Sequence, residues 1–190
     1  MPGRYFACVA AVSVLDRKIK QMPTRNDILN QLHSLRHTGF DTKLSALAQS
    51  HGFPAAYFFA IASRETNCLN ILGDRINGEF HGVGIIQIDI QHPIARQARD
   101  TGSFKTNPDP LLKFGADMIR DNIAQAKAKF PKFNDRQHMK IAASGYNCGM
   151  GNAIAGANHG DSDLHTTGHD YGRDVMTRMD IFEELIAHGE

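Results

Sequence analysis

The chain has 190 residues, a mass of 21.0 kDa and 42% hydrophobic residues, values typical of a single globular domain with a sizeable core. They exclude an intrinsically disordered chain, and no apolar run reaches the roughly 18 residues of a membrane span. The 21 basic and 20 acidic residues leave a formal net charge of +1. The chain therefore lacks the general positive field with which a nucleic-acid-binding protein holds its partner.

The longest apolar stretch, residues 6–15, comes shortly after Arg4. This arrangement has the outline of the hydrophobic region of a signal peptide, and it fits a buried helix equally well. Because no small-x-small cleavage site follows it, an uncleaved N-terminal helix is the preferred interpretation.

The next part of the chain predicts three helices. Apolar residues recur with helical spacing at 27–36 and again at 41–50, which indicates two amphipathic helices. Residues 55–62 are apolar on almost every side, as expected of a central helix buried in the core. The polar stretch 63–68 follows directly, so Glu65 is predicted at the end of the most buried element.

A small β-ribbon is expected after the central helix. Glycines and polar residues indicate tight turns at 73–78 and 82–84, and residues 85–89 alternate enough to predict a short strand. Further helices are predicted at 111–129, from 135 to a break at the glycines of 144–151, and at 171–188. The predicted fold is mainly α (α+β), a helical domain around a central buried helix with a small β-ribbon.

The position of Glu65 suits general acid catalysis, in particular the cleavage of a glycosidic bond. Burial beside apolar groups raises the pKa of a carboxyl group, so that it can still donate a proton near neutral pH. An inverting reaction needs a second carboxylate that activates water, and Asp74 and Asp89 are available in the following turns. Each residue also has an ordinary interpretation: Glu65 as a solvated residue at a helix end, Asp74 as a turn residue and Asp89 as a strand cap. Spacing alone therefore does not decide between a catalytic and a structural role.

Several motifs taken together resemble the goose-type lysozymes. They also occur, more loosely, in the soluble lytic transglycosylases of the same lysozyme-like superfamily. The resemblance extends over roughly residues 41–188, about three quarters of the chain, and implies a lysozyme-like catalytic domain at 41–190 after an N-terminal helical extension at 1–40. The motifs are residues 63–65 (SRE), 73–78 (GDRING), 82–89 (GVGIIQID), 144–152 (SGYNCGMGN) and 170–175 (DYGRDV).

The resemblance implies a role for each matching residue. It implies that Glu65 is the general acid of a peptidoglycan hydrolase, and that Asp89 and Asp74 hold or activate the attacking water. The stretch between Glu65 and Asp74 is shorter than in goose-type enzymes, so the role of Asp74 follows less directly. The residues that would line the sugar cleft are Gln87, Tyr146, Asn147, His92 and Tyr171. Amides and hydroxyls bind sugar OH groups, and aromatic faces stack on sugar rings.

The three cysteines, Cys8, Cys68 and Cys148, are too few for a disulfide-built scaffold and contain no C-x-x-C pair that would suit zinc. Two of them lie at the matching motifs as departures from the family pattern: Cys68 follows Glu65 by three residues, and Cys148 stands in the 144–152 motif where a small residue is usual. If both motifs meet at one cleft, as the resemblance implies, a Cys68–Cys148 disulfide is expected.

Three other functions compete with an inverting muramidase. A lytic transglycosylase cuts the same bond without a water-activating carboxylate and leaves a 1,6-anhydro end, whereas a glycan-binding module binds without turnover. A metal-dependent hydrolase would use the polar stretch near residue 165, although its spacing fits no regular ligand motif and favours a solvated loop. The residues concerned are His159, Asp161, Asp163, His165, His169 and Asp170.

The resemblance also sets expectations for cofactors, partners and location. The chemistry needs no metal or organic cofactor. The expected partner is the peptidoglycan glycan strand, with a proteinaceous lysozyme inhibitor as a second, and the chain is expected to act as a monomer. Its substrate places it outside the cell or in the periplasm, by an export route that the N-terminus does not define.

Overall fold

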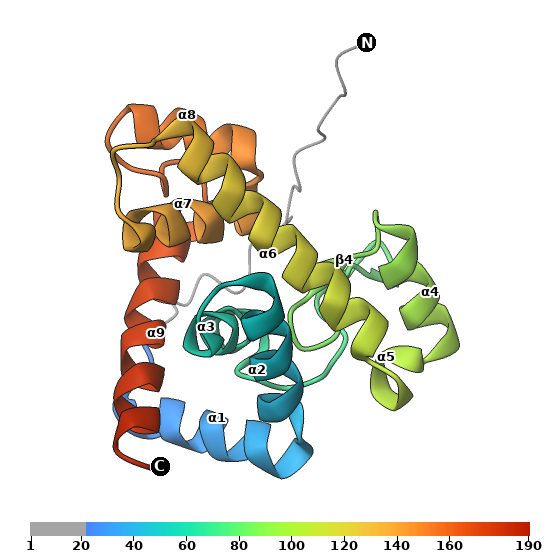
Figure 1. Cartoon of the computed structure of the whole chain (residues 1–190). Coiled ribbons are helices and arrows are strands. Elements are labelled where there is room, and N and C mark those ends of the chain that lie inside the picture. The colour runs from blue at the N-terminus through green and yellow to red at the C-terminus, as the bar shows by residue number, and fades with distance from the viewer. Residues whose placement is uncertain (1–21) are drawn as a thin grey trace. The chain divides into compact units, whose positions relative to one another are not determined.

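The computed structural model describes residues 22–190, so the apolar stretch 6–15 lies outside the described part of the chain. The described residues form two compact units, one of residues 22–120 with 176–190 and one of residues 121–175. Two long helices, α6 (Asp109–Lys129) and α9 (Tyr171–Ala187), pass from one unit into the other (Figure 1). No helix within residues 22–190 combines the length and the apolar character that crossing a membrane requires.

Three helices open the larger unit and confirm the first three predicted from the sequence: α1 (Arg25–Thr38), α2 (Phe40–His51) and α3 (Ala55–Thr66). A capping box between Thr24 and Asp27 begins α1, and glycines with positive φ follow both α1 and α2. Nine of the twelve residues of α3 are buried, which confirms it as the central helix.

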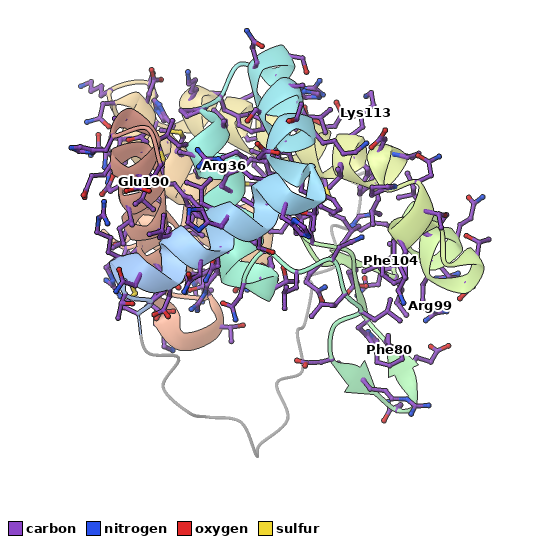
Figure 2. The ribbon with its side chains drawn as sticks, turned by 90° about the horizontal axis from the view of Figure 1, so that it is seen from below. Arg36, Phe80, Arg99, Phe104, Lys113 and Glu190 are labelled. Atoms are coloured by element: carbon purple, nitrogen blue, oxygen red, sulfur yellow. The ribbon has the colours of Figure 1, made fainter. Side chains whose placement is uncertain are left out.

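A buried polar chain joins α3 to two other helices of this unit. Arg178 of α9 is only 2% exposed, and its Nη1 donates a hydrogen bond to Ser63 Oγ at 2.7 Å. Ser63 Oγ in turn donates to Gln31 Oε1 of α1 at 2.5 Å. Arg36 near the end of α1 donates to the backbone oxygen of Glu190, so the C-terminal part of α9 lies beside α1 (Figure 2). The two bonds of Ser63 therefore attach the last turn of α3 to α1 and α9.

The β-ribbon consists of two short antiparallel pairs. The first joins β1 (Arg75–Ile76) to β2 (Glu79–Phe80), and the second joins β3 (Gly82–Val83) to β4 (Ile88–Asp89). The predicted strand at 85–89 is therefore too long, because residues 84–87 form a turn. Positive φ angles at Gly84 (82°) and Gln87 (51°) turn the chain there, a conformation that a strand does not allow.

Two helices that the sequence did not predict follow the ribbon, α4 (Pro93–Thr101) and α5 (Ser103–Thr106). Each is short, and the buried residues are only Ala95 and Ala98 of α4 and Phe104 of α5, so no run of large apolar residues marks them. Arg99 of α4 lies beside β2 in Figure 2, and its Nη1 donates to the backbone oxygen of Phe80 at 3.3 Å. The hydrogen bond attaches the β1–β2 hairpin to α4.

The smaller unit contains α7 (Asp135–Cys148), α8 (Met150–Asn158) and the short 3-10 helix η1 (Thr167–His169). The predicted break within 144–151 is confirmed only at Gly149, because α7 continues through Gly145 and α8 begins one residue after the break. A Cβ at Gly145 would lie 2.1 Å from Met150 Sδ, so this glycine permits close packing of the two helices. Overall the chain is mainly helical with a small β-ribbon, as predicted.

Candidate active site

Glu65 lies in the last turn of α3, half-buried at the end of the central helix. The helix ends because Asn67 and Cys68 both adopt positive φ angles, 53° and 62°. Their backbone N–H groups turn back to the helix, and Cys68 N donates to Ala62 O at 3.2 Å. Asparagine tolerates this conformation well, whereas a cysteine adopts it rarely. The turn that follows Glu65 is therefore tightly defined by the backbone.

Thr66, the residue after Glu65, links this turn to the β-ribbon. Its buried hydroxyl lies 2.8 Å from Ile85 O and 3.1 Å from Ala62 O, both of which accept hydrogen bonds. The same oxygen accepts a bond from Leu69 N at 3.1 Å. The role of Thr66 was not predictable from the sequence, because a threonine beside a charged residue gives no pattern of its own.

Asp89, the first candidate to hold the attacking water, lies half-buried at the end of β4. It stands opposite Gly82 in the β3–β4 pair, and its Oδ1 accepts a hydrogen bond from Gln91 N at 2.7 Å. This short side-chain-to-backbone bond fixes the carboxylate relative to its own strand.

Gln87 holds the turn before β4 together. Its Nε2 donates to Gly84 O at 2.7 Å and to Ile71 O at 3.1 Å. A Cβ on Gly73 would lie 1.8 Å from Gln87 Oε1, and one on Gly82 would lie 2.0 Å away, so the amide packs directly against two glycine backbones. Both amide hydrogens are thus used within the protein, and sugar binding by Gln87 stays a prediction.

The other two candidates in this unit have different environments. Asp74 is exposed in the turn before β1, and its backbone oxygen accepts a bond from His81 N at 3.1 Å. His92 precedes α4, half-buried, with its ring centroid 4.9 Å from that of Phe114. The larger unit therefore carries Glu65, Asp74, Gln87, Asp89 and His92 on one helix end and the hydrogen-bonded ribbon that follows it.

The predicted cleft residues of the smaller unit lie at two helix ends. Tyr146 and Asn147 are half-buried in the last turn of α7, and Asn147 Oδ1 accepts a bond from Thr167 N at 2.9 Å. Tyr171 begins α9 and is 3% exposed. The burial of Tyr171 leaves little of its ring surface for a ligand.

Asp163, by contrast, has a structural role in this unit. It is fully buried, and its carboxylate accepts bonds from Gly172 N at 2.7 Å, Arg173 N at 3.0 Å and Ser144 Oγ at 2.9 Å. A buried carboxylate beside the first turn of α9 complements the N–H groups of that turn, which the helix's own carbonyls do not bond. The solvated-loop prediction is therefore wrong for Asp163. Within residues 22–190, no three histidine, cysteine or acidic side chains are grouped as a metal ion requires.

The expected Cys68–Cys148 disulfide is absent, because both cysteines are buried free thiols. Cys68 Sγ lies within 3.8 Å of Gln31 Oε1 in the larger unit, and burial raises the pKa of its thiol, an effect that the nearby Arg178 charge opposes. Cys148 packs in an apolar cluster of the smaller unit, and burial raises the pKa of its thiol to about 11. Each cysteine thus behaves as a small core residue.

Comparison with known proteins gives one consistent result. A family model described as "Lysozyme g" matches residues 29–185, a range that begins within the segment 1–40. A lysozyme g of Epinephelus coioides is 28% identical over 150 residues, which cover 76% of this chain and 74% of that protein. A lysozyme g of Casuarius casuarius is 26% identical, covering 76% and 73% of the two chains. Since the family model covers most of the sequence, the chain belongs to the lysozyme g family.

Proposed function

We propose that the chain hydrolyses the β-1,4 bond between N-acetylmuramic acid and N-acetylglucosamine in peptidoglycan by an inverting mechanism, with Glu65 as general acid. Its family makes it a glycoside hydrolase of the muramidase type. The observation that carries the residue assignment is the position of Glu65. It lies at the half-buried end of the central helix, and Thr66 bonds this end to the segment that leads to Asp89.

The proposed reaction uses two carboxyl groups in opposite states. The Glu65 carboxyl gives its proton to the glycosidic oxygen as the bond to the anomeric carbon breaks. A water held by Asp89, with Asp74 as a second acceptor, attacks that carbon from the opposite face and loses a proton to the carboxylate. The products are a free hydroxyl on one sugar and a reducing end of inverted configuration on the other.

Substrate binding is proposed for the remaining candidates. Tyr146 and Asn147 would bind sugar hydroxyl and acetamido groups through their polar atoms, and His92 would offer its ring face. Gln87 and Tyr171 are kept in this set with smaller expected contributions. The Gln87 amide hydrogens are already bonded to backbone, and Tyr171 is almost fully buried.

The test compares wild type with Glu65→Gln and Asp89→Asn on purified peptidoglycan fragments, with proton NMR of the first product formed. Both variants keep the side-chain shape, and each should lose about 10²–10⁴-fold in kcat. The first-formed reducing end should be the α-anomer. A 1,6-anhydro product would instead identify a lytic transglycosylase, and a β-anomer would show a retaining mechanism.

The proposed location follows from the proposed substrate, and the proposed assembly is a monomer. The enzyme acts where peptidoglycan is accessible, outside the cell or in the periplasm, as a monomer that a proteinaceous lysozyme inhibitor can block. Light scattering coupled to size exclusion tests the monomer directly, and a mass near twice 21.0 kDa would contradict it.

A further inference from the structure

Thr66 links the segments that carry the two proposed catalytic carboxyl groups, those of Glu65 and Asp89. It directly follows Glu65, and its hydroxyl is bonded to Ile85 O, four residues before Asp89. The side chain is buried, at 6% exposure, so solvent offers little replacement for these bonds. A hydroxyl has one hydrogen, which here lies near two carbonyl acceptors, while its oxygen accepts from Leu69 N.

We infer that Thr66 is a positioning residue, a conclusion that rests on the proposed function. Its hydroxyl holds the Glu65 carboxyl at the position that catalysis requires relative to the segment carrying Asp89. An inverting glycosidase separates its two carboxyl groups by about 6.5–9.5 Å, so that a water fits between the substrate and the base. α3 and the ribbon are different elements, and each carries one of these groups. The Thr66–Ile85 bond joins the two elements within the turn that follows Glu65.

The local backbone makes this bond consequential. Asn67 and Cys68 hold positive φ angles that non-glycine residues adopt rarely, and such conformations persist where surrounding bonds determine them. The Thr66 hydroxyl makes three of those bonds. They go to Ala62 O in α3, to Leu69 N after the turn and to Ile85 O in the ribbon. Without the hydroxyl, Ile85 O loses a partner in a buried place, and Leu69 N keeps only its bond to Thr66 O at 3.3 Å. The turn can then relax with Glu65 attached to it.

The experiment replaces Thr66 by Val, which keeps the branched shape without the hydroxyl, and by Ser, which keeps the hydroxyl without the methyl. The probe is a soluble peptidoglycan glycan fragment, for which kcat and KM are measured separately. Since a misplacement of about 1 Å costs on the order of 10²-fold in rate, we expect Thr66→Val to lower kcat by about 10- to 100-fold. Its KM should stay near the wild-type value, and Thr66→Ser should retain most of kcat.

A matched control comes from the end of α1. Thr38 Oγ1 also donates to backbone oxygens, those of Ser34 and Leu35, but these bonds stay within its own helix. Thr38→Val therefore removes the same chemical group at an exposed position, without breaking a bond between two elements, and should leave kcat unchanged. Thermal melting of each variant shows that it is folded at the assay temperature, and Thr66→Ala replaces Thr66→Val if the latter does not fold.

A double-mutant comparison separates positioning from general loosening. If Thr66 acts through Glu65, Thr66→Val should add little to the loss already caused by Glu65→Gln, because coupled residues are not additive. A folded Thr66→Val with wild-type kcat, or full additivity with Glu65→Gln, would overturn the inference. Equal losses in the Val and Ser variants would do the same. An inactive wild type would count against the proposed function itself, so the two failures are distinguishable.

Discussion

Replacing Asp163 by alanine should destabilise the protein strongly, because its carboxylate is the shared acceptor of the smaller unit. Gly172 N and Ser144 Oγ both donate to Oδ1, at 2.7 and 2.9 Å, and Arg173 N donates to Oδ2 at 3.0 Å. Alanine removes both acceptor oxygens and therefore all three hydrogen bonds at once. The two backbone N–H groups belong to the first turn of α9, where the helix itself provides no acceptor.

The magnitude follows from the number and kind of these bonds. A hydrogen bond to a charged group contributes about 1.5–3 kcal/mol, and an unsatisfied buried donor costs about 1–3 kcal/mol. Loss of the carboxylate also removes its own desolvation cost, so we expect a net loss of about 3–5 kcal/mol for Asp163→Ala. Asp163→Asn keeps one oxygen but turns an NH2 group toward a donor, and should lose about 1.5–3 kcal/mol.

Urea unfolding followed by circular dichroism measures both losses, with the slope of the free energy against urea checked for constancy. Losses of 3–5 kcal/mol correspond to a fall in melting temperature of about 6–20 °C for a chain of this size. The reasoning is refuted if alanine and asparagine cost the same, or if either costs less than about 1 kcal/mol. Such a result would mean that water replaces the carboxylate at the start of α9.

Two further predictions concern the ribbon and the thiols. Gly82→Ala places a methyl 2.0 Å from Gln87 Oε1 and should lower both stability and activity. Gly151→Ala meets no atom within 4 Å and lies in α8, where alanine is the better helix residue, so it should leave activity unchanged and not lower stability; equal melting temperatures of the two variants would contradict this. Alkylation without reductant, followed by mass spectrometry, should find both Cys68 and Cys148 fully modified in the unfolded protein. In the native protein both thiols should be modified slowly. Because burial raises both thiol pKa values, that of Cys148 to about 11, the native reaction should accelerate toward high pH; a disulfide-linked peptide would contradict the free thiols.

Helices with a continuous apolar face were predictable from the sequence, and α3 is the clearest case. Its run 55–62 is apolar on nearly every side, and the structure buries it. The α4 helix was missed because its buried residues are chiefly two alanines, Ala95 and Ala98, which add little to a hydrophobic pattern. The strand predicted at 85–89 was too long, because the Gln87 side chain stabilises a turn that apolar alternation does not reveal.

The candidate site was predictable as a set of motifs and less so as a set of contacts. The motifs taken together indicated the family, which the family model confirms over residues 29–185. The disulfide was wrong because motif order does not fix where a thiol points: Cys68 lies near Gln31 Oε1, whereas Cys148 packs in an apolar cluster. Thr66 and Asp163 act through hydrogen bonds to backbone groups far along the chain, which no sequence spacing encodes.

The most direct test of the account is the clearing of purified peptidoglycan by wild type and Glu65→Gln side by side, with the soluble products assayed for reducing ends. The account predicts clearing and new reducing ends for wild type, and a loss of at least about 10²-fold in the variant. Clearing by Glu65→Gln at a rate near that of wild type would contradict the assignment of Glu65 as the general acid.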